Sequence, residues 1–217
     1  MMRNTLYSPK GLILGSVLCF LMQSLFIAPQ LLKRKDYIAP PLVIKHLSAG
    51  LNIQMADSFW LRAIQDFDFC DQPVNEKECH GQSWLFHVIN LTVELDPIFK
   101  DAYFYGALAL TVLISDYTGA SQIFDKAVTA YPNDWMINYT AGYHALYEEK
   151  NKTKAGRLYL AAADHGAPSW VRLMAGRLAF EGGDKDFAKK VLMQMMSIDE
   201  RPEWIERLRK KMSSSQE

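Results

Sequence analysis

Small and large apolar residues recur along this chain at helical spacing. In three stretches a small residue is followed four positions later by a large one and three positions after that by another small one. Residues three and four apart lie on one face of an α-helix, so each stretch predicts an amphipathic helix. The three sets are Ala120/Phe124/Ala127, Ala155/Tyr159/Ala162 and, with a larger last member, Ala188/Leu192/Met195.

Glycines and prolines mark the ends of repeating units. A glycine lies 12 to 14 residues before each set, and a proline recurs at steps of 34 to 36 residues. These residues are Gly106, Gly142 and Gly176, and Pro97, Pro132, Pro168 and Pro202. A period of about 34 residues with two helices per unit is typical of stacked helical hairpins, whose neighbours share one elongated core. We expect the small residues to let the two helices of a hairpin approach each other closely.

Two segments, GALALTVLISDYTGASQIFDKAVTAYP and GYHALYEEKNKTKAGRLYLAAADHGAP, resemble units of the tetratricopeptide repeat (TPR) family. The resemblance covers about Ala56 to Pro202 and implies an all-α solenoid of about four helical hairpins that binds other proteins. A fourth unit, AGRLAFEGGDKDFAKKVLMQM, keeps the glycine and Ala188. The helix EWIERLRKKM that follows Pro202 is expected to cap the array, within a terminal segment 203–217.

The first unit is degenerate. Its first helix is expected at Ala56–Phe67 and its second around Leu85, with the insertion DFCDQPVNEKECHGQ between them. The helix ADSFWLRA followed by such an insertion is also similar to membrane-anchored bacterial TPR proteins. Before it, residues 33–55 are expected to form a stiff linker containing Pro40 and Pro41 and a short lead-in helix from about Ile44 to Asn52.

An uncharged segment precedes this array. Residues 11–32 contain no charged side chain over 22 positions, which is about 33 Å of helix against a hydrocarbon core of about 30 Å. We expect an uncleaved single membrane span here, with residues 1–10 as its flank. A cleaved signal peptide is the alternative, but cleavage after Ala28 would place Pro29 next to the cut, and no A-x-A triplet lies nearby.

Two cysteines, Cys70 and Cys79, bracket the insertion in the first unit. They predict a disulfide in an oxidising compartment. The alternatives are two free thiols in the cytosol, or a metal site that adds His80 and Asp71.

The charges that flank the span and the cysteines of the array predict opposite orientations in the membrane. Lys33, Arg34 and Lys35 after the span slightly favour a cytoplasmic array by the positive-inside rule, against Arg3 and Lys10 before it. Because a disulfide between Cys70 and Cys79 requires an oxidising compartment, we expect a single-pass inner-membrane protein whose repeats are periplasmic.

The net charge and the absence of known catalytic motifs argue against several classes of function. The chain has 24 basic and 24 acidic residues and a net charge of +0, so we expect no nucleic-acid partner. It contains no phosphate-binding glycine loop, no H-E-x-x-H and no G-x-S-x-G, so we expect no enzyme, no cofactor and no metal.

The first helix of each TPR unit is expected to line a groove, and the groove positions are counted from the helix glycine. They are Trp60, Ile64, Phe67, Tyr103, Ala107, Leu110, Tyr139, Tyr143, Leu146, Leu173, Arg177 and Phe180. Tyrosines and aliphatic side chains suit an apolar peptide. We therefore expect a scaffold or assembly factor that binds other proteins of a bacterial cell-envelope complex. The alternative is an accessory subunit of a membrane enzyme, held through a span that contains Gln23 and Gln30.

Overall fold

The computed structural model describes residue 13 and residues 15–22, 38–66 and 79–213. The chain divides into two units, Met1–Ile38 and Ala39–Glu217. Within Met1–Ile38, Ile13 and residues 15–22 are helical and exposed. No helix among the described residues is both long and apolar enough to cross a membrane. The anchor expected at residues 11–32 therefore stays a prediction.

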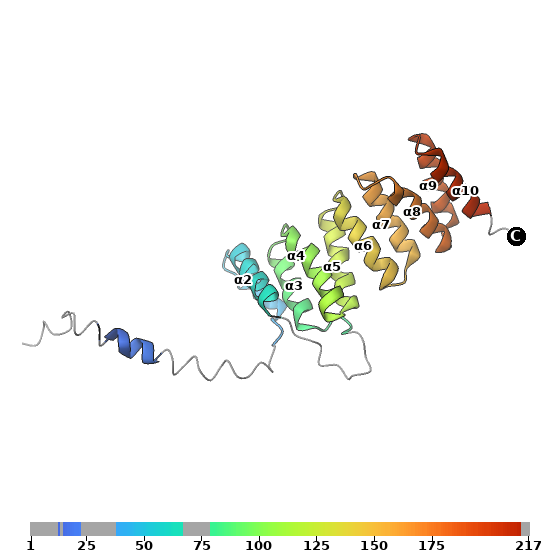
Figure 1. The fold of residues 1–217 in the computed structure, drawn as a ribbon. Coiled ribbons are helices and arrows are strands. Elements are labelled where there is room, and N and C mark those ends of the chain that lie inside the picture. The colour runs from blue at the N-terminus through green and yellow to red at the C-terminus, as the bar shows by residue number, and fades with distance from the viewer. Residues whose placement is uncertain (1–12, 14, 23–37, 67–78, 214–217) are drawn as a thin grey trace, which may run out of the picture. The chain divides into compact units, whose positions relative to one another are not determined.

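The second unit is built of helices that follow one another along an array (Figure 1). Consecutive helices pair as hairpins, α2 with α3, α4 with α5, α6 with α7 and α8 with α9, and α10 packs on α8 and α9. The expected all-α class and the repeat-like arrangement of helices are confirmed, and no strand occurs among the described residues. The elements are η2 (Leu42–His46), α2 (Asn52–Gln65), α3 (Trp84–Leu95), α4 (Lys100–Ala109), η3 (Leu110–Ile114), α5 (Tyr117–Ala130), α6 (Trp135–Tyr147), α7 (Lys152–Asp164), α8 (Trp170–Glu181), α9 (Lys185–Ser197) and α10 (Pro202–Ser213).

The lead-in to the array differs from the expectation. Leu42–His46 forms a single 3-10 segment instead of a helix that continues to Asn52. Ala49 and Gly50 follow with φ of +49° and +87°, conformations that cannot continue a right-handed helix. The first helix of the first hairpin then begins at Asn52, four residues before the expected Ala56, and ends at Gln65.

The repeated small residues form the interior of the array. Ala120, Ala127, Ala155, Ala162 and Ala188 each have 0% exposure. Met195, which replaces the last small residue of its set, is equally buried and packs with Val191 and Leu208. The spacing of the small residues therefore marks the side of each second helix that faces the core.

The glycines of the first helices make room for large side chains. A Cβ at Gly142 would lie 3.1 Å from the Tyr159 ring, and one at Gly106 would lie 2.8 Å from Ile89. Backbone approaches backbone elsewhere, at Gly156 of α7, where a Cβ would lie 3.0 Å from the carbonyl oxygen of Ala175 in α8. The closest contact between two helix backbones at a glycine thus joins neighbouring hairpins instead of the two helices of one hairpin.

Helix α4 ends in a wider π-turn, η3, over Leu110–Ile114. Ser115 follows with φ of +61°, and the Asp116 N–H donates to the Leu110 carbonyl at 2.9 Å. A π-turn takes up extra residues within a helix. Ala120 follows Gly106 by 14 positions in the hairpin α4/α5, whereas Ala188 follows Gly176 by 12 positions in α8/α9, and the π-turn lies within the longer stretch.

A buried carboxylate joins the first two hairpins. Asp116 has 0% exposure and caps α5 by accepting from the Gly119 N–H at 3.0 Å. It also accepts from the Gly81 N–H at 2.7 Å, and from the Ser83 N–H at 3.2 Å and the Ser83 hydroxyl at 2.5 Å. Ser83 is itself the N-cap of α3, because its hydroxyl accepts from the Phe86 N–H. One side chain therefore fixes the starts of both α3 and α5.

The far end of the array is closed by α10. Leu208 is 1% exposed and packs against α9, and Trp204 and Ile205 cover the same cluster. Arg172 at the start of α8 is buried and forms ion pairs with Asp164 and with Glu200, the latter at 3.7 Å. Its guanidinium thus links the end of α7 to the segment that precedes α10.

Asp116→Ala is expected to lower the free energy of unfolding by about 3 kcal/mol or more. The substitution leaves three buried N–H groups and a buried hydroxyl without their acceptor. Chemical denaturation followed by circular dichroism measures the loss. Asn151→Ala is the matched control, since Asn151 caps α7 through one exposed bond to the Lys154 N–H, and its loss should cost about 1 kcal/mol. Equal losses in the two variants would contradict the role given to Asp116.

Candidate functional site

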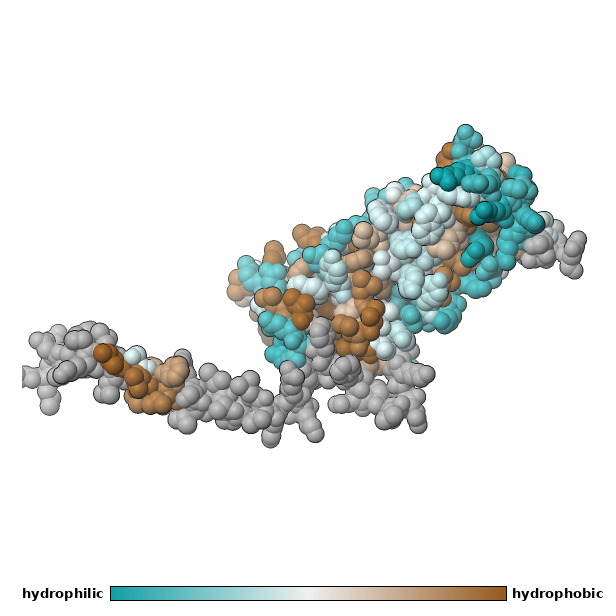
Figure 2. Space-filling view, viewed as in Figure 1, coloured by the Kyte–Doolittle hydropathy of each residue, from teal (hydrophilic) through white to brown (hydrophobic). Residues whose placement is uncertain are grey.

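We define the first-helix face as the surface formed by α2, α4, α6 and α8, the first helices of the hairpins, and continued by α10. Three features lie along it: an apolar hollow at α2–α4, a row of aromatic rings at α6–α8, and a pocket with cationic walls at α8 and α10. On the side drawn in Figure 2, exposed apolar residues gather over α2 to α5, and hydrophilic residues cover α9 and α10.

The apolar hollow has a volume of about 320 Å³. Ile64 and Tyr105 stand at its edge with 50% and 55% exposure, although both are large side chains. Trp60 is held by an edge contact with the Phe99 ring, 5.7 Å between centroids. Because no charged residue lines it, the hollow suits an apolar side chain. Its lining is Trp60, Ala63, Ile64, Leu85, Ile89, Tyr105, Gly106 and Ala109.

The aromatic row begins with Tyr143 and Tyr147 of α6, whose ring centroids are 4.4 Å apart. It continues with Tyr139, which makes an edge contact of 6.0 Å with Trp170 of α8. Tyr143, Tyr147 and Trp170 are 51%, 47% and 43% exposed. Tyr139 is anchored from below by the buried Tyr159 ring at 5.3 Å. These contacts orient the rings before any partner binds.

The cationic pocket has a volume of about 260 Å³. Its floor is apolar, formed by residues of α8 and by Leu208 of α10, and its walls include three cationic side chains. Two of these, Arg207 and Lys211, lie one turn apart on α10, and the third, Arg177, lies on α8. The lining is Trp170, Leu173, Met174, Arg177, Arg207, Leu208 and Lys211.

One carboxylate beside this pocket is shared by several cations. Glu181 lies 3.2 Å from Lys152, 3.3 Å from Lys211 and 3.7 Å from the Arg177 Nε. Burial alone would raise the pKa of Glu181, but the hydrogen bonds from Lys152 and Lys211 outweigh it and hold the pKa below its usual value. The ionised Glu181 therefore connects α7, α8 and α10 at this end of the face.

The predicted groove residues divide into three groups. Trp60 and Ile64 line the apolar hollow, and Leu173 and Arg177 line the cationic pocket. The second group lies on α6 and α8 outside the hollows: Tyr139 and Tyr143 in the aromatic row, and Leu146 and Phe180 half-buried. Phe67 lies outside the described residues. The third group, Tyr103, Ala107 and Leu110, is 4% exposed or less and is enclosed in the core.

The three enclosed residues all belong to α4 and the π-turn, and the choice of reference glycine explains them. A Cβ at Gly106 would meet Ile89 of the preceding hairpin, whereas one at Gly142 would meet Tyr159 of its own hairpin, so the two glycines do not hold equivalent positions. The residues two positions further on are the accessible ones: Tyr105 and Ala109 line the hollow, and Val112 is 72% exposed. Unequal glycine-to-alanine spacing is the sequence signal that could have corrected the count. Tyr147 and Trp170 were missed because only three positions per helix were counted.

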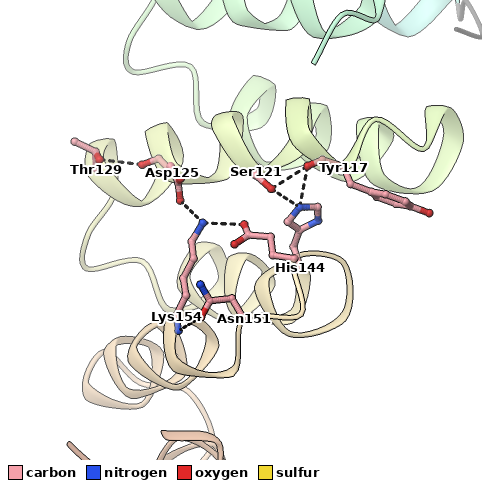
Figure 3. A network of polar contacts seen from close by, with 8 residues as sticks. Tyr117, Ser121, Asp125, Thr129, His144, Asn151 and Lys154 are labelled. Carbon is pink, nitrogen blue, oxygen red and sulfur yellow. Dashed lines mark hydrogen bonds and ion pairs between the residues drawn. The ribbon is translucent and has the colours of Figure 1, made fainter. Parts of the chain in front are cut away.

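A polar network lies inside the array between α5 and α6 (Figure 3). The imidazole of His144 is 2% exposed, and its Nε2 lies 3.0 Å from the Ser121 hydroxyl and 3.2 Å from the Tyr117 carbonyl oxygen. A carbonyl only accepts, so Nε2 carries the proton. The Thr111 hydroxyl lies 3.1 Å from Nδ1 and also 3.0 Å from the Ala107 carbonyl oxygen. Burial lowers the pKa of His144, which keeps the ring neutral at neutral pH. Its polar atoms are satisfied inside the array, and this network is structural.

The second half of the network joins α5 to α7 at the surface. Lys154 of α7 bridges Asp125 of α5 and Glu149, at 2.8 Å from each (Figure 3). Asn151, drawn beside it, caps α7 through the Lys154 N–H at 2.9 Å. The Lys154 side chain therefore ties the start of α7 to α5.

Cys79 is disulfide-bonded and 2% exposed, with its sulfur 3.9 Å from the carbonyl oxygen of Ile114. Its predicted partner Cys70 lies outside the described residues, as does Asp71 of the alternative metal site, so the pairing with Cys70 stays a prediction. In the part of the chain that the structure describes, no three His, Cys, Asp or Glu side chains are grouped to hold a metal ion.

No protein-family model matches this chain, and no curated protein matches it. The chemistry of the first-helix face is therefore the basis for assigning a function.

Proposed function

We propose that this protein is a membrane-anchored, TPR-type interaction module that serves as a scaffold or assembly factor of a bacterial cell-envelope complex. The single observation that supports this best is the exposure of large apolar side chains on the first-helix face. Tyr105 and Tyr143 are each more than half exposed, on different helices of one stack. Exposed apolar surface of this kind marks interaction sites in soluble domains.

The bound segment is a stretch of another protein with apolar side chains. The hollow at Trp60 and Ile64 accepts one such side chain, and the tyrosines of α6 offer flat contact area with hydrogen-bonding tips. Tyrosines lose little conformational entropy on binding, and these rings already support one another. An extended or helical apolar segment fits such a face.

The anchor in this proposal is the uncharged segment 11–32, and its support comes from the sequence alone. The repeats are placed in the periplasm. The disulfide bond of Cys79 supports an oxidising compartment, because structural disulfides persist there and are rare in the cytosol.

Tyr105→Ala combined with Tyr143→Ala is expected to reduce partner recovery roughly tenfold. The two rings are removed from a central contact surface, where truncating an aromatic side chain is costly. The measurement is co-purification in mild detergent from cells that express the full chain at native level, with partners quantified by mass spectrometry. Met193→Ala is the control, since Met193 is 66% exposed on the second helix α9.

Replacing residues 11–32 with an unrelated apolar helix separates this proposal from the accessory-subunit alternative. Recovery should survive the replacement if the first-helix face holds the partner. The opposite result would contradict the proposal: partner recovery is lost when residues 11–32 are replaced but is unchanged in the double tyrosine variant. That result would support an accessory subunit held in the membrane.

The two thiols of the repeat domain should react only after reduction. Cells that express the Cys19→Ala chain are quenched with acid, denatured and treated with a polyethylene glycol maleimide, with and without prior reductant. Denaturation is needed because Cys79 is buried. A gel shift by two labels that requires reductant is the expected result. The same shift without reductant would place the domain in a reducing compartment and exclude the Cys70–Cys79 pair.

A further inference from the structure

The two ends of the first-helix face differ in chemistry. The hollow at α2–α4 is lined only by apolar side chains and glycine, whereas the pocket at α8 and α10 adds Arg177, Arg207 and Lys211 to an apolar floor. The chain as a whole is neutral, with 24 basic and 24 acidic residues. The cationic walls are therefore a local arrangement and not the result of a basic protein.

The cations around this pocket differ in their ion pairs. Glu181 is shared by Lys152, Arg177 and Lys211. Arg207 adds a fourth positive charge at the pocket and forms no ion pair with any described residue. No acidic side chain is among the residues that line the pocket. An added carboxylate would be attracted to this site without displacing an existing partner of Arg207.

The apolar floor restricts what can bind. Trp170 is 43% exposed and Leu173 is half-buried, and both line the pocket together with the cationic groups. A free inorganic anion would satisfy the charges but leave this floor in water. A protein segment that places an acidic side chain next to a bulky apolar one satisfies both, since apolar burial and charge pairing then occur together.

We propose that the cationic pocket binds an acidic stretch of the partner segment, with one apolar side chain of that stretch on the floor formed by Trp170 and Leu173. This proposal rests on the proposed function of the first-helix face and gives the bound segment a direction. Its apolar part lies toward α2 and its acidic part lies against α8 and α10. Arg207 is the residue that most directly recognises the acidic part.

The test uses the full chain, purified in mild detergent, and a phage-displayed library of random 12-residue peptides. Peptides selected on the wild-type chain are expected to be enriched in Asp and Glu beside Leu, Ile, Phe or Trp. Arg207→Glu is expected to weaken binding of those peptides roughly tenfold, with Arg207→Gln between the two. Lys210→Glu is the matched control: it makes the same charge change on an exposed residue of α10 that does not line the pocket.

Each other outcome has a definite meaning. The selected peptides could show no preference for acidic residues and yet fail to bind the Tyr143→Ala variant. That result would overturn this inference and leave the proposed function standing. Equal weakening by Arg207→Glu and Lys210→Glu would overturn it too, because the effect would then be one of overall charge. A library in which nothing is enriched over bare beads would overturn both proposals. Thermal unfolding of each variant, followed by circular dichroism, verifies that α10 remains folded.

Discussion

The architecture depends on a steric constraint: at repeated positions, side chains must be small so that helices can pack. Gly156 lets α7 lie against the backbone of α8, and Gly142 leaves the space that the Tyr159 ring fills. The buried alanines of the second helices act in the same way. With these positions occupied by small residues, each hairpin buries its apolar side against the next, and larger rings are left on the first-helix face.

Polar groups inside the array set the register of this packing. Asp116 connects the starts of α3 and α5, and His144 links α6 to the end of α4 and to α5. A buried polar group is tolerated only when its partners are in place, so each network admits one arrangement of its helices. The aromatic rings of the first-helix face belong to these helices, so the polar networks also fix the positions of the rings relative to one another.

Much of the fold could be predicted from the sequence, since its period and its small residues are local and regular. The site was predicted less completely. The prediction puts Tyr103 in the groove because the count starts from Gly106, which faces Ile89 of the preceding hairpin and not the second helix of its own hairpin. Asp116 gave no sequence signal beyond an ordinary helix cap, because its other partners lie more than 30 residues away. The cationic pocket was missed for a similar reason: it forms only where α10 folds back onto α8.

The central claim is that a partner binds the first-helix face and not the outer surface of the second helices. Site-specific photo-crosslinking tests this claim most directly, with benzoylphenylalanine placed in cells at Tyr105, Tyr143 or Met193. The account predicts one crosslinked product of the same mass from Tyr105 and Tyr143 and none from Met193. Crosslinks that form at Met193 but at neither tyrosine would contradict it.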